Sequence, residues 1–342
     1  MTTLQGTAGR PTVIIAAGDP AGIGPEVAVK AALDARVRAS MRPILVAHPE
    51  LVAETCALLA LPSPEVRLVN PAEDLSDLPG DALWVVPPPC PLERTRPGVA
   101  SASAGRMAAA YFEEAIRLTD SGFGQSLVTA PLHKGNLAAA RAPYRDHTDG
   151  LASMLGVAGP RTVFETGDLR IFFATRHLSL RDALDALHRD LLVDLAERAA
   201  ADLLGLLGVE RPRLALAALN PHAGDGGLFG REEIEILAPA VEVARARGIN
   251  LAGPLPADAV FHLAASGHYD AVLSLYHDQG HIAAKTRDFF GTISYTLGLP
   301  FLRTSPDHGS ALDIAGQGDA CARSMVLACL AAAERGRRWR EK

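Results

Sequence analysis

Three histidines of this sequence lie just after the ends of short apolar runs. Imidazole is a side chain well suited to binding a catalytic divalent metal. His177, His222 and His277 each stand in a polar segment, and the segments of His222 and His277 also contain a glycine. The runs that precede them are Arg170–Thr175, Arg213–Leu219 and Ala271–Tyr276. In a parallel sheet the carboxyl ends of the strands face one ligand crevice, so the three imidazoles are expected to converge there. Three imidazoles with an open coordination position favour zinc first among the metals.

A second group of residues has the chemistry of an anion site. Lys285 and Arg303 flank a strand-like passage, and His147 and Thr148 add an imidazole and a hydroxyl. Arginine offers a planar fork to phosphate or carboxylate, whereas lysine acts as a mobile point charge. Asp258 ends the segment Gly253–Asp258, where we expect a rigid turn, and it is a candidate base or partner of a metal ligand.

The elements that must position these residues follow an α/β pattern. Short apolar runs bounded by glycine or proline alternate with longer amphipathic stretches, which predicts a parallel or mixed sheet. Besides the three runs above, strands are expected at Thr12–Ala17, Pro43–Ala47, Ala82–Val86, Ser126–Ala130 and Thr292–Thr296. Helices are expected at Pro25–Arg36, Ser101–Leu118, Leu191–Leu207, Glu232–Arg247 and Ala320–Arg335.

Length, charge and composition narrow the class of protein. The 342 residues suggest two domains, and the formal charge of −6 argues against a nucleic-acid surface. The four cysteines form no C-x-x-C pair, which indicates a reducing, cytoplasmic setting. We expect no secretion signal and no membrane-spanning segment, because no apolar run reaches the roughly 18–20 residues needed.

The common dinucleotide-binding fingerprint is absent. All four G-x-G sites, at Gly22, Gly122, Gly224 and Gly316, lack the third small residue of G-x-G-x-x-G/A. The segment Gly18–Glu26 still has the form of a strand-to-helix loop with proline in the first helical turn, and its outward amides suit an anion or cofactor. Any dinucleotide must therefore be held by another architecture.

Taken together, the motifs of this chain resemble the 4-hydroxythreonine-4-phosphate dehydrogenase family of vitamin B6 biosynthesis. The resemblance rests on eight ordered segments over nearly the whole chain. They are Gly18–Val27, Thr129–Leu137, His147–Asp149, Ala174–Asp182, Leu219–Glu233, Gly253–Asp258, Tyr276–Gly280 and Leu297–Gly316.

The resemblance implies an α/β, two-domain fold like that of isocitrate and isopropylmalate dehydrogenases, with a central cleft. We expect a first domain of residues 1–139 and 315–342 and a second of residues 140–314. The resemblance also implies a homodimer with the active site at its interface. NAD or NADP would be the cofactor, together with a divalent metal, zinc first and magnesium or cobalt as alternatives.

By position, the resemblance assigns His177, His222 and His277 as metal ligands, the last reaching across the dimer interface. His147, Thr148, Lys285, Ser294 and Arg303 correspond to the residues that hold the phosphorylated substrate. Lys285 and Asp258 are the candidate catalytic residues. The implied reaction oxidises a secondary alcohol to a β-keto acid, which then loses CO2.

Several positions depart from the usual pattern of the family. Ser294 stands where asparagine is usual, Asp146 replaces glycine, and the loop Thr286–Gly291 is less glycine-rich. The segment His277–Ile282 is similar to a side branch that acts on threonate or erythronate 4-phosphate, which is the alternative substrate class. A carboxylated dihydrodiol dehydrogenase of the terephthalate type ranks third, and a non-catalytic ligand-binding protein is a further alternative.

Overall fold

The structure is a computed structural model that describes residues 9–61, 65–69 and 82–341 of the chain. These residues form two compact units: unit 1 holds the described part of Met1–Pro160 together with Gly298–Glu341, and unit 2 holds Arg161–Leu297. Residues 140–160 and 298–314, expected in the second domain, belong to unit 1. The reason is local packing, since Arg303 lies on a strand that pairs with Ser126–Thr129, and His147 packs on Phe112.

Unit 1 is built on a fully parallel sheet with the strand order β3-β4-β2-β1-β5-β12. Its strands are β1 (Thr12–Ala16), β2 (Arg42–Val46), β3 (Val66–Leu68), β4 (Leu83–Val86), β5 (Ser126–Thr129) and β12 (Leu302–Pro306). Every residue of β1, β5 and β12 is buried, as expected for parallel strands covered on both faces.

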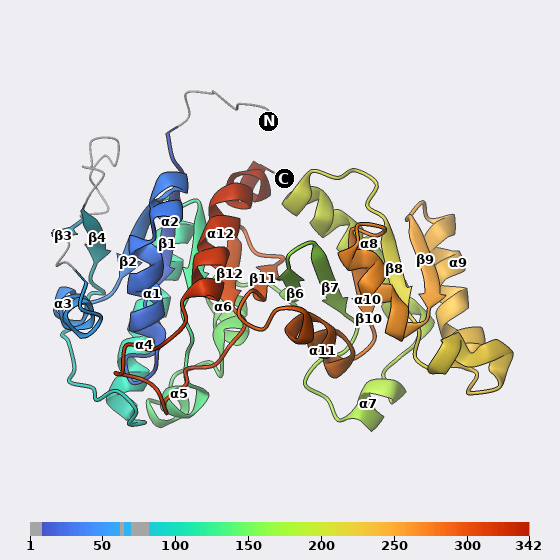
Figure 1. The fold of residues 1–342 in the computed structure, drawn as a ribbon, viewed down its shortest axis with the longest axis horizontal. Helices are drawn as coiled ribbons and strands as arrows, with labels where there is room; N and C mark the ends of the chain where they lie inside the picture. Colours follow the sequence, from blue (N-terminus) through green and yellow to red (C-terminus); the bar gives the residue numbers. More distant parts are fainter. Residues whose placement is uncertain (1–8, 62–64, 70–81, 342) are drawn as a thin grey trace. The chain divides into compact units, whose positions relative to one another are not determined.

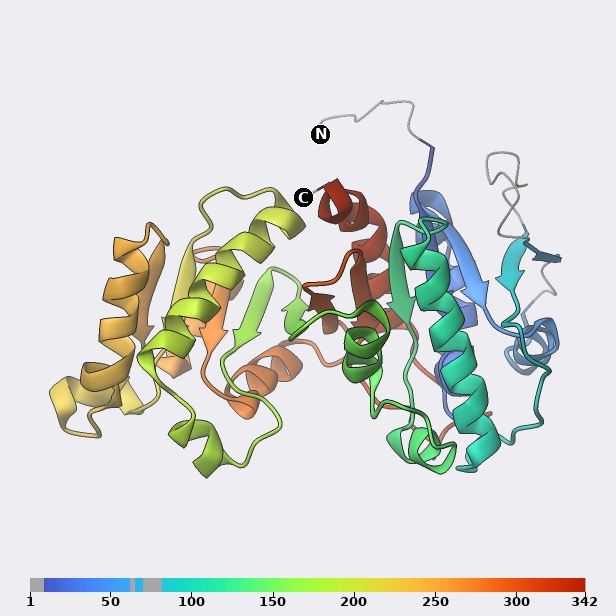
Figure 2. The same cartoon turned by 180° about the vertical axis from the view of Figure 1, so that it is seen from behind.

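Helices cover both faces of this sheet. In Figure 1, α1 and α12 lie in front of the strands, and in Figure 2 the view from behind shows α4 over the other face. The helices of unit 1 are α1 (Gly24–Leu33), α2 (Ala35–Ser40), α3 (Pro49–Leu58), α4 (Ala102–Asp120), α5 (Lys134–Ala139), α6 (His147–Leu155) and α12 (Arg323–Glu341).

Unit 2 has a mixed sheet with the order β11-β6-β7-β10-β8-β9. Its strands are β6 (Arg161–Thr166), β7 (Leu169–Phe173), β8 (Leu214–Ala217), β9 (Leu251–Leu255), β10 (Ala271–Ser274) and β11 (Ile293–Leu297). The strand β6 is antiparallel to both β11 and β7, whereas β7, β10, β8 and β9 are parallel neighbours. The carboxyl ends of β7, β10 and β8 therefore lie side by side.

The helical segments of unit 2 surround this sheet. They are α7 (Leu180–Asp185), α8 (Arg189–Leu207), the 3-10 segment η2 (Pro221–Gly227), the π-helical turn η3 (Glu233–Leu237), α9 (Ala238–Ala246), α10 (Ala257–Ala265) and α11 (His277–Arg287). Val260 and Ala264 of α10 and Ala284 of α11 pack with Phe173 and Val272 in one apolar core. Figure 2 shows α8 over the opposite face of the sheet.

The α/β class and the mixed sheet agree with the sequence, and each of the eight expected strands overlaps an observed one. The segment Gly253–Asp258 was expected to be a turn, and this is wrong. Leu251–Leu255 is strand β9, paired with β8 through a bulge, and Asp258 lies in the first turn of α10. Gly253 has a φ of +124°, and a Cβ there would meet the Leu216 carbonyl oxygen at 2.6 Å. No helix among the described residues is both long and apolar enough to cross a membrane.

Candidate functional site

The three histidines predicted as metal ligands all follow strands of unit 2 that are direct neighbours. His177 comes after β7, His277 opens α11 after β10, and His222 lies in η2 after β8. Since β10 pairs in parallel with both β7 and β8, the three segments leave the sheet at the same edge. The sequence-based placement of these residues at adjacent strand ends is thus confirmed.

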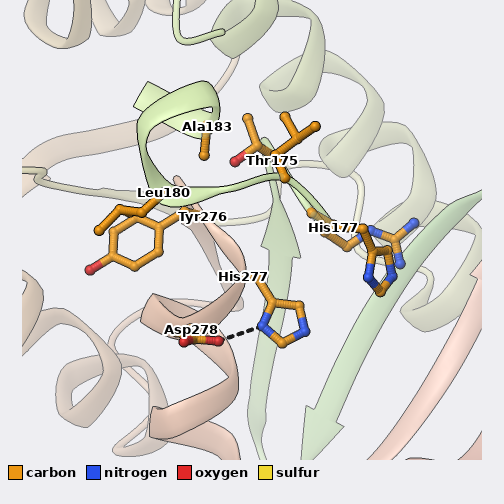
Figure 3. Close-up of a pocket in the computed structure, with 9 residues that line it drawn as sticks. Thr175, His177, Leu180, Ala183, Tyr276, His277 and Asp278 are labelled. Carbon is orange, nitrogen blue, oxygen red and sulfur yellow. Dashed lines mark hydrogen bonds and ion pairs between the residues drawn. The ribbon is translucent and has the colours of Figure 1, made fainter. Parts of the chain in front are cut away.

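Two of these imidazoles line one pocket of about 270 Å³. The ring centroids of His177 and His277 are 5.8 Å apart. Figure 3 shows His177 on the segment after β7 and His277 with Asp278 at the start of α11. His277 Nδ1 lies 2.6 Å from Asp278 Oδ1, so the carboxylate fixes the ring and leaves Nε2 for another partner.

His222 is exposed and lies in a backbone segment of unusual conformation. Its φ and ψ are 53° and 31°, in the left-handed region, and His177 also has a φ of 53°. Non-glycine residues rarely adopt this conformation, and when they do they often belong to functional sites. Among the described residues, no group of three or more His, Cys, Asp or Glu side chains is arranged to hold a metal ion. The chain thus brings His177 and His277 together but does not bring His222 into the same cluster.

Gln279 ties the ends of two strands together, a role that sequence reasoning did not assign. Its Oε1 accepts hydrogen bonds from the Leu275 N–H at 2.8 Å and from the Ser274 hydroxyl at 3.1 Å. Its Nε2 donates to the Ala218 carbonyl at 2.8 Å, which joins the end of β10 to the end of β8. The signal was its place in the motif Tyr276–Gly280, two residues after His277.

One face of α11 carries polar residues at helical spacing. His277, His281 and Lys285 are four residues apart, so they lie on one side of the helix. The His281 ring stacks on Phe173 at 4.8 Å between ring centroids and touches Phe164 edge-on at 4.1 Å. Burial, followed by the charges of His277 and Lys285, lowers the pKa of His281 to about 4, against the opposing effect of Asp278. This imidazole is therefore neutral at neutral pH.

The segment after Lys285 explains part of the altered loop. Lys285 Nζ lies 5.3 Å from the centroid of the Phe289 ring, a cation–π distance. Asp288 ends α11 and accepts a hydrogen bond from the Gly291 N–H at 2.9 Å. Ser294 follows on β11, where it is buried and pairs in register with Phe164.

Asp258 is exposed in the first turn of α10. A negative charge in the first turn interacts favourably with the helix dipole, which is a structural reason for an aspartate at this position.

In unit 1, Arg303 is a buried cation. Its side chain lies on β12, the residue is 4% exposed, and Nε donates to the Thr129 hydroxyl at 3.1 Å. A second hydrogen bond runs from Nη2 to the same hydroxyl. Burial lowers the pKa of Arg303 to about 9, while the charge of Asp146 opposes this shift.

His147 belongs to the same electrostatic environment as Arg303. Its pKa is held well below the usual value, first by burial and then by the Arg303 cation, against a hydrogen bond with the Ala130 backbone. The ring packs edge-on against Phe112 at 5.0 Å, and its Nε2 is buried without a hydrogen-bond partner. Unit 1 thus brings together two of the residues predicted to hold an anion.

The departure at Asp146 has a structural explanation. Its carboxylate caps α6 by accepting a hydrogen bond from the Asp149 N–H at 3.0 Å, and it lies 3.5 Å from Lys134 Nζ. Since α6 begins at His147 and continues with Thr148, this cap fixes the helix turn that carries both predicted substrate residues.

Other histidines have structural roles. His48 hydrogen-bonds the Tyr111 hydroxyl and the Cys90 carbonyl, both at 2.9 Å, and His188 caps α8. His133 caps α5 by accepting a hydrogen bond from the Asn136 N–H.

The loop between β1 and α1 has the predicted strand-to-helix form, with Pro25 in the first helical turn. Asp19 is fully buried and accepts hydrogen bonds from the Ala21 N–H and from Asn136 Nδ2, both at 2.8 Å. The Ile23 N–H donates to the Ser310 carbonyl. That the loop faces an anion or cofactor stays a prediction.

Comparisons with known proteins agree with the motifs. The family profile described as pyridoxal phosphate biosynthetic protein PdxA matches residues 39–332. A relative from Symbiobacterium thermophilum, provisionally named D-threonate 4-phosphate dehydrogenase, is 44% identical over 92% of this chain and 94% of its own length. Another from Cutibacterium acnes, with the same provisional name, is 45% identical over 93% of this chain and 92% of its own length.

The solved structures include a similar protein. The crystal structure of 4-hydroxythreonine-4-phosphate dehydrogenase from Klebsiella pneumoniae matches with a TM-score of 0.84 and 38% identity, covering 96% of this chain and 99% of that one. A profile match over most of the chain and identities of 38–45% over nearly its full length establish the family. The chain belongs to the PdxA family of pyridoxal phosphate biosynthetic proteins and is a dehydrogenase of that family.

Proposed function

We propose that this enzyme oxidises the secondary alcohol of a four-carbon, 4-phosphorylated hydroxy acid, with D-threonate 4-phosphate as the first candidate. The observation that carries the chemistry is the placement of His177, His277 and His222 after three adjacent parallel strands. The provisional names of the relatives from Symbiobacterium and Cutibacterium favour the acid lacking an amine over 4-hydroxythreonine 4-phosphate.

The donor set fits a divalent metal, with zinc as first choice and magnesium or cobalt as alternatives. Imidazoles with one oriented ring nitrogen are common metal ligands, and Asp278 orients the His277 ring through its Nδ1. We propose that His177 and His222 of one copy hold the metal together with His277 of a second copy, which makes a homodimer the active form. When bound, the metal would stabilise negative charge on the substrate oxygen.

The chain's own residues would bind and orient the substrate. We assign the 4-phosphate and carboxylate to His147, Thr148, Lys285, Ser294 and Arg303, because they supply cations, hydroxyls and an imidazole. Arg303 suits this role because its guanidinium is held by Thr129 and because burial strengthens its attraction to an anion.

The reaction then requires hydride and proton acceptors. NAD or NADP would take the hydride from the alcohol carbon, and the hydroxyl proton would pass to a base, for which Asp258 is our candidate. The resulting β-keto acid loses CO2 by cleavage of the bond to its carboxylate carbon. We also propose that the enzyme has an isocitrate dehydrogenase-like fold with a central cleft. Its proposed location is the cytoplasm.

An absorbance assay at the NAD(P)H band tests this proposal. Zinc- or magnesium-loaded protein is offered D-threonate 4-phosphate, erythronate 4-phosphate and 4-hydroxythreonine 4-phosphate with each cofactor. We expect reduction with the acids that lack the amine. Reduction only with 4-hydroxythreonine 4-phosphate would assign the chain to the B6 pathway instead. No reduction with any of the three would overturn the proposal and favour the dihydrodiol or non-catalytic alternative.

A further inference from the structure

The loop that carries His222 has a backbone conformation that ordinary residues avoid. Six consecutive residues, from His222 to Gly227, have positive φ values between 43° and 100°. Three of them, His222, Ala223 and Asp225, are not glycine. Each left-handed, non-glycine residue costs roughly 1–2 kcal/mol, so neighbouring contacts must hold this loop in place.

The carboxylate of Glu233 supplies these contacts. The residue is 4% exposed, and its Oε1 accepts hydrogen bonds from the Leu219 N–H at 2.9 Å and the Asn220 N–H at 2.7 Å. Its Oε2 accepts from Asn220 Nδ2 at 2.8 Å. All three donors belong to the two residues directly before Pro221, at the point where β8 leads into the loop. Hydrogen bonds to a buried carboxylate are about twice as strong as neutral ones.

The local helix geometry brings Glu233 to this position. Glu233–Leu237 is a π-helical turn before α9, and such turns are frequent at functional sites. The carboxylate also lies close to the middle of the loop, because a Cβ on Gly224 would lie 2.8 Å from its Oε2. One buried side chain therefore fixes the entry of the loop and packs against its middle.

We propose that Glu233 is a positioning residue that sets the direction of the His222 imidazole toward a bound divalent metal. The inference rests on the proposed function, because it assumes that His222 is a metal ligand. Glu233 itself hydrogen-bonds backbone and Asn220 rather than the imidazole, so it acts through the loop.

The test is metal binding by the Glu233→Gln variant. Glutamine keeps the volume but turns an NH2 group toward Asn220 Nδ2, which places two donors face to face. We expect Co²⁺, titrated into metal-free protein and followed by its visible absorption, to bind about 10- to 100-fold more weakly than in the wild type. The Leu219 and Asn220 amides should also exchange hydrogen faster.

Glu235→Gln is the matched control, because Glu235 lies in the same π-helical turn but is exposed and pairs with Arg231 at 2.6 Å. It should bind Co²⁺ like the wild type. Glu233→Asp keeps the charge on a shorter side chain and should recover part of the affinity. If Glu233→Gln does not fold, as judged by circular dichroism, Asn220→Ala removes one of the three hydrogen bonds and should still weaken Co²⁺ binding.

His222→Ala separates the two levels of the proposal. If His222→Ala loses Co²⁺ affinity while folded Glu233→Gln, or Asn220→Ala in its place, binds like the wild type, the role of Glu233 is overturned and the metal site stands. If His222→Ala itself binds Co²⁺ like the wild type, the proposed metal site fails.

Discussion

The imidazole rings of His277 and His281 lie one helical turn apart on α11 with their centroids only 3.6 Å apart. His281 is in turn stacked on Phe173, so a predicted metal ligand rests on a neutral ring that the apolar core of unit 2 supports. His281 thus belongs to the support of His277 rather than to a separate site.

Replacing His281 by leucine should weaken catalysis without unfolding the protein. The variant loses the stacked and edge-on ring contacts, which contribute about 0.5–1.5 kcal/mol per aromatic pair, and leaves His277 less constrained. We expect kcat/KM for the acid phosphates to fall by up to about tenfold. Thr286→Ala, on an exposed position of the same helix, should match the wild type, and an unchanged kcat/KM in His281→Leu would argue against the supporting role.

Mixing inactive variants tests whether two copies share one site. His222→Ala and His277→Ala should each lack turnover, but unfolding and refolding an equal mixture should restore about a quarter of wild-type activity. Half of the dimers would be mixed, and each of these would hold one intact site of two. A mixture of His177→Ala with His222→Ala should stay inactive, because both ligands come from the same copy. No recovery in the first mixture would place all three ligands in one chain.

Arg303→Lys should weaken substrate binding more than it slows turnover. Lysine has no fork to hydrogen-bond both the Thr129 hydroxyl and an anion, and a buried ammonium loses its charge more readily. We expect KM for the phosphorylated substrate to rise at least about tenfold with a smaller change in kcat. The KM for the nicotinamide cofactor, measured in the same assays, should not change. An unaltered substrate KM would remove Arg303 from the anion site.

We expect the buried His147 ring to lower the free energy of unfolding as the pH falls from neutral to mildly acidic. Its pKa is far below 6.5 in the folded state because of burial and the Arg303 charge. The unfolded chain therefore takes up a proton on this residue as the pH falls below about 6.5, while the folded chain does not. Stability from this residue is complete above that pH, and it decreases as the pH falls toward the folded pKa.

Thermal unfolding of the wild type and of His147→Gln between pH 7.5 and 5.5 measures this effect. The wild-type midpoint should fall more steeply, with a difference of about 2–4 °C per pH unit below 6.5. Parallel curves for the two proteins would show that the ring is protonated equally in both states.

The sequence was sufficient to predict the strands and helices that have strong local signals. The apolar runs around Ile14 and Val272 form strands in which every residue is buried. The helix after Ser101 starts where the Ser101 hydroxyl accepts a hydrogen bond from the Ala104 N–H. Strands β3, β6, β9 and β12 escaped prediction. The strand β6 begins with two charged or polar residues, and β9 contains Gly253 and Pro254, so their pairing partners rather than their composition make them strands.

The site was predictable by residue type and position but not by geometry. His177, His222 and His277 could be placed at strand ends because β-α alternation fixes where strands stop. The parts that hold them, Gln279, Glu233 and His281, act through contacts between residues from different elements. Glu233 reaches Leu219 only because a π-helical turn and a left-handed loop face each other, and neither has a local sequence signature.

Unit 2 is one continuous stretch of the chain, Arg161–Leu297. Unit 1 is discontinuous, because it includes Gly298–Glu341, which follows unit 2 in the sequence. During synthesis on the ribosome, unit 2 is therefore complete before β12 and α12 emerge. Until then, β5 has an unpaired edge where β12 will bind, and Ser126, which later donates to the Ala332 carbonyl, has no helix beside it. The order of emergence means that unit 1 is the last to close, and its exposed strand edge makes nascent chains that stop near residue 300 prone to aggregation.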